Sequence, residues 1–92
     1  MCGIAAIIAT TGNAAAIDPS VLDRMGDSLA GRGPDASGIW IAPDARVALL
    51  NRRLATQDAR PIAHQPCWSH DRRVVAVMNG EIYNHPELRP TL

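Results

Sequence analysis

The stretch GIWIAPDARVALL, residues 38–50, contains two apolar runs with a short polar interruption between them. The runs, residues 38–42 and 46–50, include Ile, Trp and Val, which are residues that strands favour. Between them the chain reads Pro-Asp-Ala, a combination typical of a tight turn. The stretch therefore predicts a β-hairpin, and with it a sheet that other parts of the chain can extend.

The residues before the hairpin predict one more strand and a helix. Residues 3–9, GIAAIIA, form a continuous apolar run, which is typical of a strand buried on both of its faces. A helix is then indicated by apolar residues that recur every four positions: Ile17, Val21, Met25 and Leu29. Asp18 is a favourable N-cap and Gly31 a favourable left-handed stop, so we expect the helix over residues 19–30.

The C-terminal half predicts further strands and the start of another helix. Residues 55–71 contain two Pro and two His without apolar periodicity, and we expect a long irregular loop there. Residues 73–78, RVVAVM, form the strongest strand signal; an Asn-Gly turn and a short strand at 81–83 follow. A short helix is expected over 85–89. This order of elements predicts an α+β fold whose sheet is unfinished.

Length and charge limit the classes of protein to which the chain can belong. Ninety-two residues, 47% of them apolar, have material for one modest core, which is one small domain or a fragment of a larger one. Nine Arg balance nine acidic residues, which argues against a nucleic-acid partner. The N-terminal apolar run lacks a preceding basic segment and is too short for a bilayer, so we expect neither signal peptide nor membrane helix. A cytoplasmic protein with reduced Cys2 and Cys67 is expected.

Cys2 is the first candidate for chemistry. If Met1 is removed, Cys2 carries a free α-amine beside its thiol. The amine titrates at about 7.7 to 8.0 and the thiol at about 8.5, so near neutral pH the amine can accept the thiol proton. The alternative is that Cys2 is a small buried residue at the start of a strand, which is common for cysteine.

Three other groups could bind or stabilise a reacting substrate. The Asn79 side chain and the Gly80 N–H could converge on one oxygen as an oxyanion hole, or form an ordinary turn. Arg53 lies just beyond the predicted hairpin, where its guanidinium could hold a substrate carboxylate through two hydrogen bonds. Residues 32–35, Arg-Gly-Pro-Asp, could order a loop over a site or form a solvated turn.

A metal site is not expected. His64, Cys67 and His70 recur every three residues, but a structural zinc site needs four ligands and Cys2 would have to be recruited. The chain also lacks a P-loop, a GxGxxG motif and a nucleophile elbow, so no nucleotide site is predicted.

Short motifs follow one another along the whole chain: Met1-Cys2-Gly3-Ile4, Arg32-Gly33-Pro34-Asp35, Ser37-Gly38-Ile39-Trp40, Arg53-Leu54 with Asp58, Gln65-Pro66, Asn79-Gly80-Glu81-Ile82-Tyr83-Asn84 and Glu87-Leu88-Arg89. Each motif is weak alone. In this order, across residues 1–92, they resemble the glutaminase domain of glutamine-hydrolysing asparagine synthetases.

The resemblance implies a class II glutamine amidotransferase, which is an N-terminal-nucleophile hydrolase built as an α-β-β-α sandwich. Cys2 would then be the nucleophile that attacks the glutamine side-chain amide, with its own α-amine as general base. Asn79 and Gly80 would form the oxyanion hole, Arg53 would hold the glutamine α-carboxylate, and Glu81 would help to fix the α-amine. Water would resolve the resulting glutamyl thioester to glutamate, and ammonia would be released.

The family also implies parts that residues 1–92 do not contain. Ammonia would pass to a C-terminal synthetase domain that uses ATP and magnesium to make asparagine from aspartate, so no cofactor is expected in this chain. The family's glutaminase domain is itself longer and contributes a Gly-Ser-Asp segment downstream. We therefore expect residues 1–92 to be a partial glutamine amidotransferase type 2 domain, an incomplete sandwich from a truncated or split protein.

Two interpretations of different class follow. In the first, the chain hydrolyses glutamine by itself or after completion by a second chain with the missing strands and the synthetase domain; its expected partner is that chain or a second copy in a homo-oligomer. In the second, it is a non-catalytic fragment that folds or acts only with a completing chain.

Some positions depart from the family pattern. Gly31 and Asn51 stand where the family usually has His, and Ala-Thr-Gln at 55–57 replaces a Ser followed by aliphatic residues. The change at 55–57 weakens the hydrophobic packing expected to orient the loop that carries Arg53. Cys2 is retained, which argues against the relatives that have lost the nucleophile.

Overall fold

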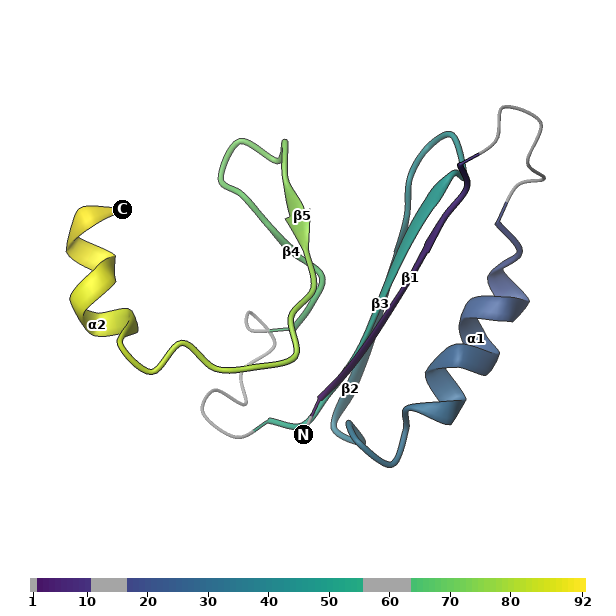
Figure 1. Ribbon diagram of the computed structural model, residues 1–92, viewed down its shortest axis with the longest axis horizontal. Helices are drawn as coiled ribbons and strands as arrows, with labels where there is room; N and C mark the ends of the chain where they lie inside the picture. The colour runs from purple at the N-terminus through teal and green to yellow at the C-terminus, as the bar shows by residue number, and fades with distance from the viewer. Residues whose placement is uncertain (1, 11–16, 56–63) are drawn as a thin grey trace.

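The computed structural model describes residues 2–10, 17–55 and 64–92. Its larger sheet is antiparallel, with the strands in the order β1-β3-β2, and a two-stranded sheet is formed by β4 and β5 (Figure 1). The elements in chain order are β1 (Gly3–Ile8), α1 (Pro19–Ser28), β2 (Ala36–Ile41), β3 (Val47–Arg53), β4 (Cys67–Trp68), β5 (Val75–Ala76), α2 (His85–Leu88) and a 3₁₀ helix, η2 (Arg89–Thr91). This mixture of helix and sheet agrees with the predicted α+β class.

The predicted hairpin is present as β2 and β3. The two strands pair antiparallel with Ile39 opposite Leu50, and both extend beyond their predicted bounds at the open end of the hairpin. In the connecting turn Ala45 has a φ of 56°, and its N–H donates to the Ala42 carbonyl at 2.8 Å. β1 pairs with the other edge of β3, so β3 is the central strand.

Helix α1 covers one face of this sheet and supplies the core. Leu22 of the helix and Leu50 of the central strand are fully buried, and Ile17 and Ala48 complete the buried cluster. The predicted cap is confirmed, because the Asp18 carboxylate accepts a hydrogen bond from the Ser20 N–H at 2.9 Å.

The end of the helix differs from the prediction. The helix ends at Ser28, ahead of the expected residue 30, because Leu29 has a φ of −95° and a ψ of −2° and serves as the C-cap. No glycine among the described residues has a positive φ, so the prediction of Gly31 as a left-handed stop is wrong.

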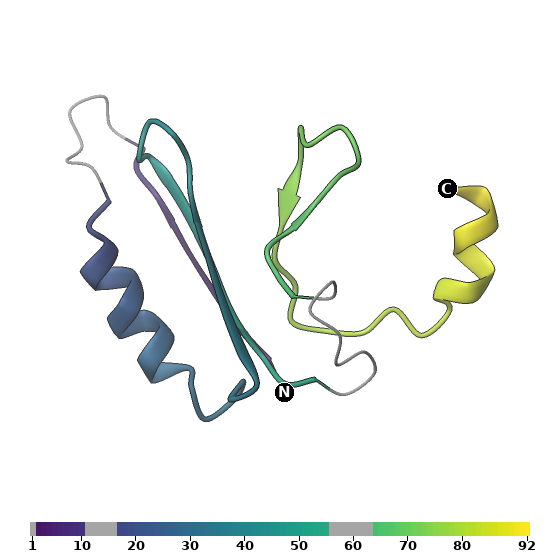
Figure 2. The same ribbon diagram turned by 180° about the vertical axis from the view of Figure 1, so that it is seen from behind.

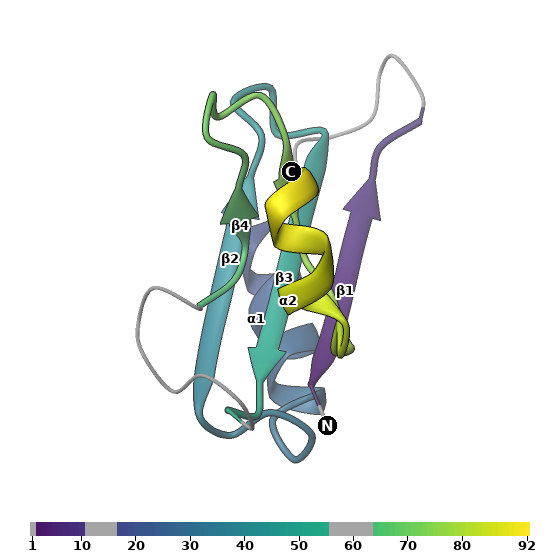
Figure 3. The same ribbon diagram turned by 90° about the vertical axis from the view of Figure 1, so that its left-hand side faces the viewer.

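Strand β1 is covered on one face only, which corrects the expectation that it is buried on both. Ala5 and Ile7 pack against the core, whereas Ile4 is 44% and Ile8 65% exposed. The cause is the arrangement of the layers: α1 lies on one side of the sheet, and the β4–β5 hairpin on the other side lies over β2 rather than β1 (Figures 1 and 3).

The β4–β5 hairpin packs against β2 through aromatic contacts and a glycine. The Trp40 and Trp68 rings meet edge to face with centroids 5.6 Å apart, and the Arg72 guanidinium lies 4.6 Å from the Trp68 ring centroid. A Cβ atom at Gly38 would collide with the carbonyl oxygen of Gln65. Gly38 therefore allows the Gln65-Pro66 backbone to approach the sheet closely.

The C-terminal half contains less strand than predicted. Of the expected loop at 55–71, residues 56–63 lie outside the described residues, and Cys67–Trp68 forms strand β4. Only Val75–Ala76 of the expected strand at 73–78 is paired, because this stretch has a partner of just two residues. Residues 81–83 are not a strand, which corrects that prediction.

The predicted terminal helix is present as α2, and η2 follows it. Helical structure therefore continues through Arg89–Thr91 and is not stopped at Pro90 as expected. Both helices are exposed and extend away from the sheet, on the far side of the β4–β5 hairpin (Figure 2).

Candidate active site

Cys2 lies directly before β1 and beside the C-terminal end of β3. Its thiol is half-buried, and the Leu54 N–H donates a hydrogen bond to Sγ at 3.4 Å, while the thiol donates to the Leu54 carbonyl at 3.8 Å. In the sheet Gly3 pairs with Arg52. Continuing that register by one residue places Cys2 beside Arg53, so two of the predicted site residues come together.

The Arg-Gly-Pro-Asp loop holds this corner of the sheet. Arg32 Nε donates to the Cys2 carbonyl at 3.0 Å, and Arg52 Nε donates to the Gly33 carbonyl at 3.0 Å. The Asp35 carboxylate accepts from the Ala55 N–H at 2.7 Å. A Cβ atom at Gly33 would collide with the Arg52 backbone, so only glycine allows this approach. These hydrogen bonds order the loop, while Arg32, Pro34 and Asp35 remain exposed.

Arg53 projects from β3 on the face opposite α1, as does Asn51 two residues earlier. Alternation along the strand fixes this, because Ala48 and Leu50 face the helix and the odd-numbered residues face away from it. Both side chains are buried: Asn51 is 1% and Arg53 is 7% exposed. Within the described part of the chain, neither Asn51 Nδ2 nor Arg53 Nη1 has a hydrogen-bond partner.

Asn79, Gly80 and Glu81 lie in the segment between β5 and α2, and all three are exposed. Figures 1 and 3 show that this segment passes beside the end of β1 at which the chain begins. No hydrogen bond between described residues joins Asn79 or Gly80 to Cys2 or Arg53. The structure thus brings Cys2 and Arg53 together and places Asn79, Gly80 and Glu81 on a neighbouring, exposed segment.

Gln65 anchors the segment between β5 and α2. The sequence did not predict this role for any residue. Its side-chain amide donates to the Met78 carbonyl at 3.2 Å and accepts from the Met78 N–H at 2.6 Å. Met78 directly precedes Asn79, so Gln65 fixes the backbone that carries the predicted oxyanion hole. The Gln65-Pro66 motif was the only sequence signal at this position.

The His64, Cys67 and His70 series is not gathered around a common point. No group of three or more His, Cys, Asp or Glu side chains close enough to hold a metal ion occurs among the described residues. Cys67 and Cys2 are both free thiols, and the Cys67 thiol donates to the Ala76 carbonyl at 3.6 Å. None of the helices within residues 2–10, 17–55 and 64–92 has the length and apolarity needed to cross a membrane.

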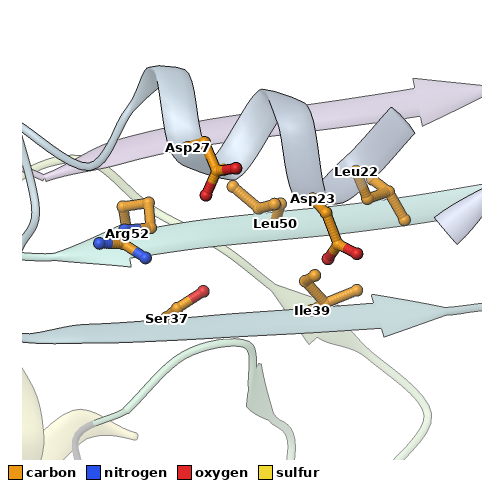
Figure 4. Close-up of a pocket in the computed structure, with 8 residues that line it drawn as sticks. Leu22, Asp23, Asp27, Ser37, Ile39, Leu50 and Arg52 are labelled. Atoms are coloured by element: carbon orange, nitrogen blue, oxygen red, sulfur yellow. The ribbon is translucent and has the colours of Figure 1, made fainter. Parts of the chain in front are cut away.

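A cavity of about 320 Å³ lies on the other face of the sheet, under α1. Figure 4 shows its lining: Asp23 and Asp27 come from the helix, Ser37 and Ile39 from β2, and Leu50 and Arg52 from β3. The sheet separates this cavity from the Asn51 and Arg53 side chains. It is therefore not part of the candidate site.

Known proteins are similar to this chain over its whole length. The family model described as a glutamine amidotransferase domain matches residues 1–92. A glutamine-hydrolysing asparagine synthetase of Triphysaria versicolor is 40% identical over 92 residues, which is 100% of this chain and 15% of that protein. Asparagine synthetase 1 of Arabidopsis thaliana is 39% identical over the same span, again 15% of its length.

A third relative, the glutamine-hydrolysing asparagine synthetase of Sandersonia aurantiaca, is 38% identical and is covered over 17% of its length. The chain thus spans about a sixth of the length of the curated relatives that it matches. No solved structure matches the chain.

Proposed function

The chain belongs to the glutamine amidotransferase domain family, and we propose that it carries out the glutaminase half-reaction of an asparagine-synthetase-type enzyme. In this reaction glutamine is hydrolysed to glutamate and ammonia. The ammonia is used outside residues 1–92, by a synthetase domain that binds ATP and magnesium and converts aspartate to asparagine. A cytoplasmic location fits this role.

Cys2 is the proposed nucleophile. After removal of Met1, the α-amine of Cys2 takes the thiol proton, and Sγ attacks the side-chain amide carbon of glutamine. The Asn79 amide and the Gly80 N–H stabilise the tetrahedral oxyanion. The proton then passes to the leaving nitrogen, ammonia departs, and a glutamyl thioester remains on Sγ. Water attacks the thioester and releases glutamate and the free thiol.

Arg53 and Glu81 position the substrate in this proposal. The Arg53 guanidinium binds the α-carboxylate of glutamine, and the Glu81 carboxylate binds its α-amine. The single observation that carries the assignment is the position of Cys2, whose sulfur is hydrogen-bonded to the residue that follows Arg53. Nucleophile and carboxylate-binding group then lie at one end of the same sheet.

We assign residues 1–92 to the N-terminal part of an α-β-β-α sandwich of the N-terminal-nucleophile type. Helix α1 and the β1-β3-β2 sheet supply one α and one β layer. The exposed side chains of Ile4 and Ile8 support this assignment, because further strands would cover them. Those strands and the synthetase domain belong to the rest of a longer chain or to a separate chain, and a homo-oligomer of residues 1–92 would cover exposed side chains without supplying either.

The second candidate function is a non-catalytic part that acts only when a completing chain is present. It is favoured by the exposure of apolar side chains in the C-terminal half, where Val74 is 62%, Ile82 51% and Tyr83 81% exposed. In this case the oxyanion-hole segment reaches its working position only after another chain packs against it.

The experiment that separates the two uses 6-diazo-5-oxo-norleucine, a glutamine analogue that alkylates such nucleophiles. The purified chain is incubated with it, and intact mass and peptide mapping locate the adduct. Modification at Cys2 in chains that lack Met1, prevented by glutamine, supports the enzyme. Cys67 is an exposed thiol and serves as the internal control for unspecific alkylation. A folded chain free of Met1 that stays unmodified favours the second candidate.

A further inference from the structure

We propose that the Asn51 side-chain amide binds the substrate α-carboxylate together with Arg53. The inference rests on the proposed function and adds to it a residue that the family resemblance does not supply. It starts from two buried donors, Asn51 Nδ2 and Arg53 Nη1, neither of which has a partner in the described part of the chain.

Both donors belong to one face of one strand. Asn51 and Arg53 are two positions apart on β3, so their side chains project to the same side with their Cα atoms roughly 7 Å apart. That side carries Cys2 next to Arg53 and lies opposite α1. A carboxylate has two oxygens, each of which accepts at about 2.9 Å, so one such group can bridge donors at neighbouring positions of a strand face.

The surrounding sheet offers these donors no acceptor side chain. Asn51 is paired with Ile4 on β1 and with Gly38 on β2, and Arg53 is paired with Ala36 on β2. None of these three neighbours has a polar side-chain atom. A buried donor without an acceptor destabilises the folded state, and native proteins rarely leave one. The pair is therefore best explained by a ligand that supplies the acceptors.

Charge identifies the class of ligand. The Arg53 guanidinium is positive and only 7% exposed, and the neighbouring amide adds a neutral donor. An anionic group with two acceptor oxygens satisfies both, and within the proposed reaction the α-carboxylate of glutamine is that group. Arg52, on the opposite face, differs in that its Nε already donates to the Gly33 carbonyl.

The test replaces Asn51 and measures fold stability and ligand affinity separately. Asn51→Leu removes the amide at similar volume, and Asn51→His retains an N–H donor. Affinity is the glutamine concentration that half-protects Cys2 from the diazo analogue. We expect Asn51→Leu to melt no lower than the native chain, yet to need about tenfold more glutamine. Asn51→His should restore most of the glutamine affinity that Asn51→Leu loses.

The carboxylate itself is tested with 4-aminobutanamide, which is glutamine without its α-carboxylate. If Asn51 binds that group, Asn51→Leu leaves protection by 4-aminobutanamide unchanged. Leu49→Met, on the same strand face, is the packing control. It should change the protection of Cys2 neither by glutamine nor by 4-aminobutanamide. If the Leu variant does not fold, Asn51→Asp keeps the shape, and its negative charge should weaken glutamine binding still further.

The outcomes distinguish this inference from the function on which it rests. A native chain that is neither modified at Cys2 nor protected by glutamine refutes the proposed function, and the inference with it. Modification and protection that are equal in the native chain and in Asn51→Leu refute the inference alone. If Asn51→Leu weakens protection by glutamine and by 4-aminobutanamide equally, the inference is also refuted, because Asn51 would then act only on the fold.

Discussion

Gly38→Ala should detach the β4–β5 layer from the sheet while leaving the sheet intact. A Cβ atom at this position would lie 2.8 Å from the Gln65 carbonyl carbon and 3.0 Å from Cδ of Pro66, and closer still to the Gln65 oxygen. Contacts of this kind require movement of backbone, not of a flexible side-chain end. The Gln65-Pro66 segment must therefore withdraw by about 1 Å or more.

The withdrawal reaches the candidate site through hydrogen bonds. Gln65 holds the Met78 backbone through two hydrogen bonds, and Asn79 follows directly. A displacement of about 1 Å at a reacting centre can cost about 100-fold in rate. We therefore expect Gly38→Ala to lower the rate of Cys2 modification by the diazo analogue about 100-fold. The position of the Cys2 thiol should not change, because Leu54 and Arg32 hold Cys2 at the sheet.

Two measurements check this prediction. Near-ultraviolet circular dichroism reports the edge-to-face Trp40–Trp68 pair, which should lose its signal, while far-ultraviolet dichroism of the main sheet should persist. Gly31→Ala is the matched control, because no atom lies within 4 Å of the position that its Cβ would take. An unchanged tryptophan signal and an unchanged modification rate in Gly38→Ala would refute the contact and the coupling inferred from it.

Three further predictions concern the core, the helix cap and the oxyanion hole. Leu50→Ala, at a fully buried position, should cost about 2 to 5 kcal/mol in urea unfolding, and a cost below about 1 kcal/mol would contradict the core described above. Hydrogen bonds from the Ser20 N–H and hydroxyl hold the pKa of Asp18 below its usual range, so its stabilising effect is present above the ordinary carboxyl pKa and lost as pH falls through the lowered one. The stability deficit of Asp18→Ala should therefore shrink in melts taken from about pH 6 down to about pH 2, and a constant deficit would exclude a charge-dependent cap. Asn79→Ala should lower glutamine turnover about 10²- to 10³-fold in any assembly that contains this chain, whereas a change of a few-fold would make Asn79 a turn residue only.

Local signals in the sequence predicted the positions of the strands and the helix in the N-terminal half, but not which faces are buried. The β2–β3 hairpin and the Asp18 cap were predicted correctly, because a turn and a cap depend on residues within a few positions of each other. The double burial of β1 was wrong, since burial depends on which layers cover a strand. Of the strand expected at 73–78 only Val75–Ala76 is present, and that expected at 81–83 is absent, because β propensity makes a strand only where a partner is present.

Motifs in the sequence named candidate site residues, but not how those residues are arranged. Motif order singled out Cys2 and Arg53, and only the register of β1 on β3 brings these distant positions together. The sequence marked Asn51 only as a departure from the family's His; that its amide is unpartnered depends on apolar neighbours that two other strands supply. The anchoring of Met78 by Gln65 likewise required the structure.

The anchoring of Cys2 has a consequence for the order of events during synthesis. The Arg32 side chain donates to the Cys2 carbonyl, whereas the hydrogen bond to the Cys2 sulfur comes from Leu54. Strand β1 acquires its partner only when β3 has been synthesised. At about 5 to 20 residues per second, translation needs roughly 3 to 10 s to reach that point. Under the proposed mechanism an aminopeptidase must free the Cys2 amine, and it has several seconds in which β1 is unpaired before Cys2 becomes fixed at the corner of a sheet.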